Sequence, residues 1–366
     1  MGRIALLIDR SYIDTQSCYM ELPIHLANNG FKVDLYMPFS TNNHQPFFQN
    51  QAIRVLPFPD SAFQKAEYWS KILYASDRKY SAIIGTPVRG VWIAYKTAFL
   101  QRIPFYYFAD ELLEHLIKDR PVPEKNRLIR QNYLANKKSA ASIVLGEERY
   151  TRQKEQNRID YPHEHIVIPN SQSGAAEKLR SNYFRDVFHI EDRKPILLFA
   201  GTLGWILAGR IYEDTKGYSD RDYHLIFQSR TVGMMGNDTH PFIKMSTIPI
   251  PSSMMNYAVS SADIGLVLYD RESPHETNNG ITAGKIGTYL KNGLPLIAGS
   301  AENLRVFEEQ GIGNFWDGKT DFDEVACRAL KSLKNNQANI PAYYKTHLQY
   351  EGFFSSLLNH LKKYES

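Results

Sequence analysis

The chain has 366 residues, of which 43% are hydrophobic and 22% are charged, and its net charge is +4 at pH 7. This length exceeds one comfortable core, so two domains are expected, and no apolar run approaches the ~20 residues that span a bilayer. A mild positive charge does not indicate nucleic acid, and two distant cysteines, Cys18 and Cys327, exclude a disulfide framework or a cysteine metal cluster and suit a reducing cytoplasm.

Apolar, β-rich runs alternate with helical patterns through the first half of the chain. Strands are predicted at 4–8, 32–36, 53–57, 81–84, 104–108, 141–145 and 166–168, with helices near 16–28, 88–100 and 125–137. Runs this apolar, separated by helices, predict a parallel sheet covered on both faces. Small polar residues after Pro169-Asn170 indicate a connector, so we place the first domain at 1–170.

A second series of strands and helices follows the connector. Its strands are predicted at 196–200, 223–228, 264–268 and 296–298, and we place this domain at 171–340. Apolar residues at helical spacing within 343–364 predict a packed amphipathic helix in the last segment, 341–366. Two α/β domains in tandem are expected to place the ends of both sheets around one cleft, where ligands of open sheets bind.

The stretch 278–298 joins a small-residue loop, a short helix and a strand, and Gly293 is predicted to end the helix in a left-handed conformation. Gly280 and Gly284 would let backbone approach a ligand, and Thr282 is a candidate helix cap. The first-turn amides and the charge of Lys285 then favour an anion. The alternative interpretation is an ordinary turn between two core elements.

The order of several motifs resembles that of a known family over nearly the whole chain. These motifs are the connector His165–Asn170, the turn Phe199–Gly204, the run Ala262–Tyr269 and the loop with Lys285, Tyr289 and Gly293-Leu294-Pro295. The chain resembles two-domain glycosyltransferases of the GT-B fold, most closely the broad group that contains glycosyltransferase family 4. The resemblance implies an α/β fold of two Rossmann-like, doubly wound parallel-sheet domains facing a central cleft, with the C-terminal helix crossing back to the N-terminal domain.

The resemblance also implies a donor site in the second domain. The donor would be a nucleotide-diphosphate sugar, UDP- or GDP-linked, bound without metal or other cofactor, with the acceptor in the first domain. The candidate donor-binding residues are Gly201, Thr202, Gly204, Arg230, Tyr269, Gly280, Ile281, Thr282, Lys285 and Tyr289, with Arg210 as a weaker candidate. For the two arginines a surface salt bridge is the alternative, and for the turn at Gly201–Gly204 it is ordinary packing. The chain departs from many members at Gly280 and Thr288, where two glutamates are common, so donor recognition must differ or the chain is inactive.

An inverting glycosyltransferase needs a group that accepts the proton of the acceptor hydroxyl. Asp110 and Glu111 follow the predicted strand 104–108, and His115 comes one turn later. These three residues are the candidates for catalysis. Capping of the next helix by Asp110 is the structural alternative, and a retaining enzyme would instead use groups near the leaving phosphate.

Seven basic residues and two acidic ones lie between Lys118 and Lys138. Such a run fits phospholipid headgroups or a lipid-diphosphate acceptor, and its ordinary explanation is a solvated helix face. From the resemblance we expect a cytoplasmic enzyme, free in solution or peripheral on the inner face of the membrane, that transfers sugar to a glycan, lipid-linked or small-molecule acceptor in bacterial surface polysaccharide or glycolipid synthesis. The alternatives are a sugar-nucleotide epimerase or hydrolase, or a binding subunit without activity.

Overall fold

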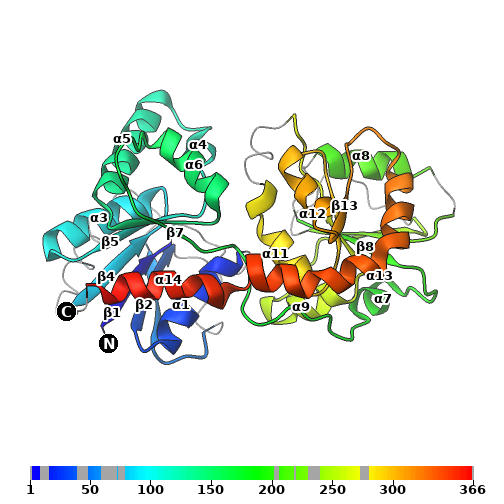
Figure 1. Cartoon of the computed structure of the whole chain (residues 1–366), viewed down its shortest axis with the longest axis horizontal. Helices are drawn as coiled ribbons and strands as arrows, with labels where there is room; N and C mark the ends of the chain where they lie inside the picture. Colours follow the sequence, from blue (N-terminus) through cyan, green and yellow to red (C-terminus); the bar gives the residue numbers. More distant parts are fainter. Residues whose placement is uncertain are drawn as a thin grey trace. The chain divides into compact units, whose positions relative to one another are not determined.

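The chain forms two open parallel sheets, as a computed structural model shows (Figure 1). The structure describes residues 2–8, 16–38, 48–58, 72, 79–201, 206–217, 220–229, 240–272 and 280–364. These residues divide into one unit made of Met1–Pro169 with Tyr350–Ser366 and a second unit, Asn170–Gln349. Each unit has its own sheet.

The sheet of the first unit has the strand order β3-β2-β1-β4-β5-β6-β7, and its described strands are all parallel. Its strands are β1 (Arg3–Leu7), β2 (Lys32–Pro38), β3 (Ile53–Phe58), β4 (Tyr80–Gly85), β5 (Phe105–Ala109), β6 (Ala141–Val144) and β7 (His165–Val167). Its helices are α1 (Ser17–Asn28), α3 (Arg89–Gln101), α4 (Leu113–Ile117), α5 (Val122–Lys138), α6 (Glu147–Gln156) and α14 (Tyr350–Lys362). Apolar residues of α1 and α14 cover one face of this sheet, and those of α3, α5 and α6 cover the other.

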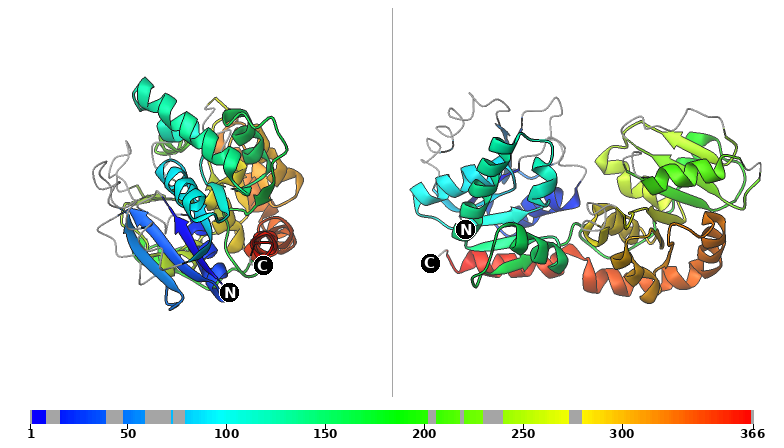
Figure 2. Two further views of the ribbon diagram at one scale, coloured as in Figure 1. Left: turned by 90° about the vertical axis from the view of Figure 1, so that its left-hand side faces the viewer. Right: turned by 90° about the horizontal axis from the view of Figure 1, so that it is seen from above.

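The sheet of the second unit has the order β10-β9-β8-β11-β12-β13, again parallel throughout its described strands. Its strands are β8 (Ile196–Ala200), β9 (His224–Gln228), β10 (Ile243–Ser246), β11 (Ile264–Val267), β12 (Leu296–Ala298) and β13 (Gly313–Phe315). Its helices are α7 (Tyr183–Phe188), α8 (Ile206–Thr215), α9 (Ser252–Ser260), α11 (Gly284–Lys291), α12 (Val306–Glu309) and α13 (Phe322–His347), with short 3-10 turns η4 (Gly280–Thr282) and η5 (Glu302–Arg305). Figure 2 shows both sheets with their helices from two further sides.

The predicted strands of both domains are present, whereas β10 and β13 were missed. Both missed strands are short, and β10 carries Lys244 while β13 begins with Gly313 and Asn314. Their sequences therefore lack the apolar run on which the prediction depended. Their place in the sheet comes from pairing with β9 and β12.

The end of the chain differs from the predicted single helix over 343–364. The structure has two helices there, because α13 continues through Pro341 to His347 and α14 begins at Tyr350. Ile340 and Tyr344 of α13 lie in the core of the second unit. The second unit consequently ends at Gln349, whereas the predicted second domain ended at residue 340.

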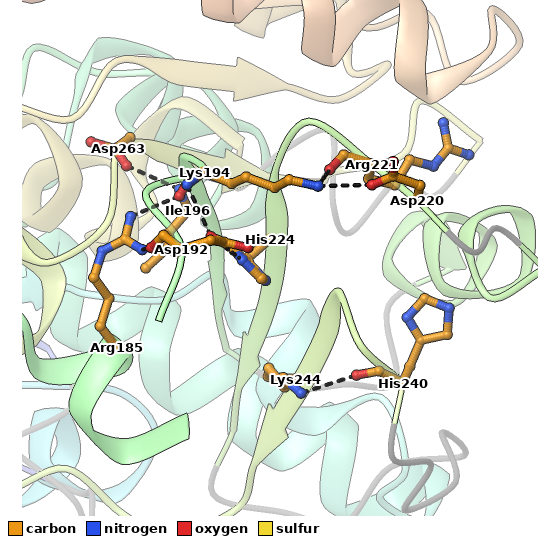
Figure 3. A network of polar contacts seen from close by, with 10 residues as sticks. All are labelled: Arg185, Asp192, Lys194, Ile196, Asp220, Arg221, His224, His240, Lys244 and Asp263. Atoms are coloured by element: carbon orange, nitrogen blue, oxygen red, sulfur yellow. Dashed lines mark hydrogen bonds and ion pairs between the residues drawn. The ribbon is translucent and has the colours of Figure 1, made fainter. Parts of the chain in front are cut away.

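Polar contacts join the amino ends of β8 and β9 (Figure 3). The Lys194 ammonium donates to Asp220 Oδ1 over 2.8 Å, and His224 Nε2 lies 2.8 Å from Asp192 Oδ1. These contacts connect the segment before β8 with the segment that leads into β9. The opposite, carboxyl end of the sheet carries Gly201, Tyr269 and Ser300, which follow β8, β11 and β12. Ligands of open parallel sheets bind at this end.

Candidate functional site

The strand order of the second sheet reverses between β8 and β11, and the carboxyl ends of such a neighbouring pair form the usual ligand crevice of an open sheet. Lys285 Nζ lies at this position, 4.6 Å from the ring centre of Phe199 in β8 and 5.1 Å from that of Tyr269 after β11. Ring faces attract a cation. The geometry therefore places the Lys285 ammonium group at the switch point.

Gly201 makes room for this ammonium group. A Cβ atom at residue 201 would lie 2.9 Å from Lys285 Nζ, closer than ordinary packing permits. Of the predicted donor residues, Gly201, Tyr269 and Lys285 are thus brought together by three separate elements of the second unit.

Helix α11 carries Lys285 and is tightly seated. Gly284 and Gly287 face the connector, where added Cβ atoms would lie 2.8 Å from Asn170 Nδ2 and 2.7 Å from the Asn170 carbonyl oxygen. Gly293 follows the helix with φ of +68°, as predicted for the residue that ends it. The lysine is accordingly held on a rigid frame.

The structure corrects the roles predicted for two small residues near α11. Gly284 makes its close approach to the Asn170 side chain, so packing within the unit already explains that glycine. Thr282 does not cap the helix, because the N-cap is Ala283 and no side chain caps it. Gly280 packs against Asn303 and Leu304. A Cβ atom added at residue 280 would lie 3.1 Å from Asn303 Oδ1.

Tyr289, predicted to bind donor, is a core residue. Its side chain is fully buried, and its hydroxyl accepts a hydrogen bond of 2.7 Å from the backbone N–H of Ala200. Burial raises the pKa of this phenol well above its usual value. Because Tyr289 has no exposed surface, it does not contact a ligand in this structure. Its hydrogen bond with Ala200 instead stabilises the end of β8.

The remaining predicted donor residues divide into described and undescribed ones. Ile281 is half-buried against the core, and Thr282 is buried. Thr202, Gly204 and Arg230 lie outside the described residues. Arg210, a weaker candidate in α8, donates to the carbonyl oxygen of Gly318.

Two polar residues at the same edge were missed by the sequence analysis. Asp270 follows β11, is buried, and accepts hydrogen bonds of 3.1 Å from Ser300 Oγ and 3.0 Å from the N–H of Glu272. Ser300 follows β12 and accepts from the N–H of Arg271. A polar residue soon after a buried strand was the signal that could have identified both.

In the first unit, Asp110 directly follows β5. It is 2% exposed and accepts a hydrogen bond from the Tyr19 hydroxyl of α1. The next helix, α4, has Leu112 as its N-cap and no side-chain cap. The alternative that Asp110 caps that helix is therefore wrong.

Glu111 is held as a carboxylate. Its Oε1 accepts from Arg149, a buried residue of α6, over 2.8 Å and from the N–H of Leu112 over 2.9 Å. Burial works to raise the pKa of Glu111, but the hydrogen bond with His115 and the charge of Arg149 outweigh it and lower the pKa to about 2. A carboxyl group with so low a pKa is a weak base at neutral pH.

His115 lies one turn from Glu111 in α4. Its Nδ1 is 3.4 Å from Glu111 Oε1, and its Nε2 is 3.5 Å from Glu114 Oε1. The side chain of His115 is 12% exposed. The structure thus gathers the three predicted catalytic residues after β5, in a carboxylate–histidine pair beside a buried aspartate. Arg10, Ser11, Tyr12 and Asp14, which the sequence places after β1, lie outside the described residues.

Neither a comparison with protein-family models nor one with curated proteins found a match. Among solved structures, a sucrose-phosphate synthase from Thermosynechococcus elongatus has a TM-score of 0.70 and 11% identity, covering 99% of both chains. HepE from Anabaena, in complex with UDP and glucose, has a TM-score of 0.72 and 11% identity, covering 99% of this chain and 100% of that one. LpCGTa in complex with UDP has a TM-score of 0.61 and 12% identity, covering 99% of both chains.

This likeness over nearly the full length shows that the chain has the GT-B fold predicted from its motifs. Membership of glycosyltransferase family 4 in particular stays a prediction. In the described part of the chain, no cluster of three His, Cys, Asp or Glu side chains could hold a metal ion. No helix in that part is long and apolar enough to cross a membrane.

Proposed function

We propose that this chain is a glycosyltransferase that moves a sugar from a nucleotide-diphosphate sugar to an acceptor hydroxyl. The observation that carries the proposal is the Lys285 ammonium at the switch point between β8 and β11. The fold supports it, since HepE was solved with UDP-glucose and with UDP. These complexes favour a uridine diphosphate sugar, with a guanosine diphosphate sugar as the second choice.

The proposed donor chemistry needs positive charge where the bond breaks. As the sugar leaves, charge develops on the diphosphate, and fixed cations and amides stabilise it if they are arranged beforehand. Lys285 supplies the charge, and the first-turn amides of the helix that follows η4 add the positive end of a helix dipole. We propose that these groups serve the diphosphate without a metal ion.

Proton removal from the acceptor is assigned to His115. The acceptor oxygen attacks the anomeric carbon, the bond from that carbon to the diphosphate breaks, and the hydroxyl proton passes to the imidazole. His115 is preferred over Asp110 because Asp110 is buried and occupied by Tyr19. Glu111 then acts as a positioning residue, because its ionised carboxylate orients the ring.

The acceptor class rests on the sequence resemblance alone. We propose a glycan or lipid-linked acceptor, with bacterial surface polysaccharide or glycolipid synthesis in the cytoplasm as the setting. Peripheral membrane contact through residues 118–138 belongs to the same proposal.

A panel of nucleoside diphosphates tests the donor site. UDP, GDP, ADP, CDP and TDP are compared for thermal stabilisation, with and without magnesium, on wild type and on Lys285→Met, which keeps the aliphatic stem beside Gly201. Charge-assisted hydrogen bonds contribute roughly 1.5 to 3 kcal/mol, so affinity should fall about 10- to 150-fold in the variant. Lys331→Met, an exposed change on α13, is the matched control.

Selective stabilisation by one nucleotide without magnesium, lost in Lys285→Met and retained in Lys331→Met, supports the proposal. Equal stabilisation of wild type and Lys285→Met would remove Lys285 from the donor site. Donor turnover that needs no acceptor would instead indicate an epimerase or hydrolase.

A binding protein without activity is the second candidate, and one observation favours it. Thr288 stands where a glutamate is common, and its hydroxyl donates to the Gly284 carbonyl oxygen over 3.1 Å. Its hydroxyl is thus engaged within α11, and the position offers no carboxylate for a ribose. Sugar transfer by the isolated chain, abolished by Lys285→Met, would exclude this candidate.

A further inference from the structure

The loops that follow β11 and β12 are joined beside the Lys285 ammonium group. The N–H of Gly299 donates to the carbonyl oxygen of Val267 over 2.7 Å, and the N–H of Ala301 donates to that of Tyr269 over 3.1 Å. A Cβ atom at residue 299 would lie 2.8 Å from the Tyr269 carbonyl oxygen, so a glycine is needed for this approach. Because the ring of Tyr269 also lies beside Lys285 Nζ, both loops border the position of the ammonium group.

Asp270 and Ser300 are polar side chains held where these two loops meet. Ser300 Oγ donates to Asp270 Oδ1 over 3.1 Å, and the N–H of Glu272 donates to the same oxygen over 3.0 Å. Ser300 Oγ in turn accepts a hydrogen bond of 3.1 Å from the N–H of Arg271. The hydroxyl therefore acts as donor and acceptor at once, which fixes its direction. The Asp270 carboxyl group is consequently held in one orientation.

The contact with Ser300 goes beyond what a turn requires of Asp270. An aspartate in a turn commonly accepts a hydrogen bond from the N–H two residues later, and the bond from Glu272 fits this pattern. The turn does not account for Ser300, which follows a different strand and contacts the same oxygen. Asp270 is 8% exposed and Ser300 is 3% exposed, so the pair is built into the edge of the sheet. A carboxylate held by donors from two loops is a fixed hydrogen-bond acceptor.

A nucleotide-diphosphate sugar brings hydroxyl groups as well as phosphates. The phosphates suit Lys285 and the helix amides, whereas sugar hydroxyls donate hydrogen bonds that a carboxylate accepts strongly. Gly280, in the turn before α11, has no side chain, and the Thr288 hydroxyl of α11 donates to the Gly284 carbonyl oxygen. Neither position supplies a carboxylate. Asp270 does, because it directly follows the tyrosine whose ring lies beside the ammonium group.

We propose that the Asp270 carboxylate accepts a hydrogen bond from a sugar hydroxyl group of the bound donor, and that Ser300 holds the carboxylate in place. This inference rests on the proposed function and adds a specificity-determining residue, Asp270, and a positioning residue, Ser300, to its donor site. The hydroxyl group belongs to the ribose or to the transferred sugar, which offer the same chemistry. The arms of the experiment separate these two sources.

Isothermal titration calorimetry of the full chain, without acceptor, tests the proposal. The ligands are UDP, its 2′-deoxy and 3′-deoxy forms, and UDP-glucose, and the guanosine counterparts replace them if GDP stabilises the chain more than UDP does. Wild type is compared with Asp270→Asn and Ser300→Ala. The matched control is Asp263→Asn, at the opposite end of β11, where Asp263 Oδ2 also accepts a backbone hydrogen bond, of 2.9 Å from Ile196. Melting curves check that each variant folds.

A hydrogen bond from a hydroxyl group to a charged group corresponds to about 10- to 150-fold in affinity. If the ribose is the source, wild type should bind UDP more tightly than one deoxy form by this factor, and Asp270→Asn should reduce the ratio about tenfold, because a neutral acceptor is weaker. If the transferred sugar is the source, Asp270→Asn should lose about tenfold with UDP-glucose and bind UDP like wild type. Ser300→Ala should shift the same ratio by a few-fold, and Asp263→Asn should leave it unchanged.

A purely structural role for Asp270 would lower the melting temperature and leave every affinity ratio at its wild-type value, which overturns the proposal. Equal changes of the ratios in Asp263→Asn would overturn it as well. If Asp270→Asn does not fold, wild-type ratios in Ser300→Ala decide against the proposal.

Failure of the proposed function gives a different result. Binding of none of these ligands, or binding that Lys285→Met does not weaken, removes the donor site and this inference with it. Lys285-dependent binding with wild-type ratios in Asp270→Asn and Ser300→Ala overturns this inference alone.

Discussion

Single side chains in this protein take their chemistry from a few close neighbours. Lys285 Nζ lies over the rings of Phe199 and Tyr269 and beside the backbone of Gly201, so the groups around it determine where its ammonium group stands. Glu111 stays ionised because Arg149 and His115 contact one of its oxygens. In both cases the environment, rather than the residue type, sets the available chemistry.

The ionised state of Glu111 predicts how stability depends on pH. Because its folded pKa is lowered to about 2 from 4.5, its contribution is complete above pH 4.5 and is lost as the pH falls toward 2. Glu111→Gln should therefore cost on the order of 2 kcal/mol at pH 7 and progressively less in acid. Urea unfolding at several pH values measures this. Glu191→Gln, an exposed carboxylate, is the control, and a cost for Glu111→Gln that is independent of pH would contradict the assignment.

The assignment of His115 as proton acceptor gives a kinetic prediction. His115→Gln should lower kcat by roughly 10²- to 10⁴-fold, the usual contribution of general base catalysis, without changing stabilisation by nucleotide. Glu114→Gln, beside the same ring but 52% exposed, should leave kcat within a few-fold of wild type. A His115→Gln variant with wild-type kcat would return the role to Asp110.

Glycines of the second unit allow its helices and strands to pack closely against one another. The ring of Tyr289 packs directly on the backbone of Gly265 in β11. A Cβ atom at residue 265 would lie 2.4 Å from this ring, so only glycine fits there. Gly287 does the same for α11 against the connector. The close fit on both sides fixes the helix that carries Lys285.

Two alanine substitutions test this fit. Gly287→Ala places a Cβ atom 2.7 Å from the carbonyl oxygen of Asn170, and it should destabilise the chain by about 1 to 3 kcal/mol. Gly209→Ala in α8 meets nothing within 4 Å, and it should stabilise by up to about 1 kcal/mol because alanine favours a helix. Chemical denaturation compares the two variants. If Gly287→Ala were as stable as Gly209→Ala, the tight packing of α11 would be refuted.

The whole chain is organised as two units with separate cores, and its last helix belongs to the first of them. Tyr350, Phe354, Leu357 and Leu361 of α14 join the core of α1 and the first sheet. The Tyr106 hydroxyl of β5 also lies 2.8 Å from His360 Nδ1 of α14. The first unit is therefore built from both ends of the chain.

This organisation predicts which unit loses stability when a core residue of α14 is replaced. Leu357 is fully buried, so Leu357→Ala should cost about 2 to 5 kcal/mol, and the loss should appear in the first unit. Hydrogen exchange should show faster exchange in β1 and β5, with β8 and β12 unchanged. Ser356→Ala, an exposed neighbour, should change neither sheet. Faster exchange confined to the second unit would show that α14 does not stabilise the first.

Much of the architecture was predictable because it depends on local patterns. Long apolar runs such as those of β1 and β8 identify buried parallel strands whatever their neighbours are. Gly293, a residue suited to a left-handed conformation, marked the end of α11 for the same local reason. Strands β10 and β13 were missed because they are short and owe their conformation to the strands beside them.

The site was predictable in its place and less so in its details. The order of the motifs indicated the GT-B fold, and residue types after the strands indicated Asp110, Glu111, His115 and Lys285. Contacts then separated residues that looked alike in sequence: both tyrosines are buried, but Lys285 Nζ lies over the ring of Tyr269, whereas the Tyr289 hydroxyl accepts a hydrogen bond from the N–H of Ala200. Arg149 was not singled out, because its partner Glu111 is 38 residues away. Such pairs depend on distances between elements, which local sequence patterns do not contain.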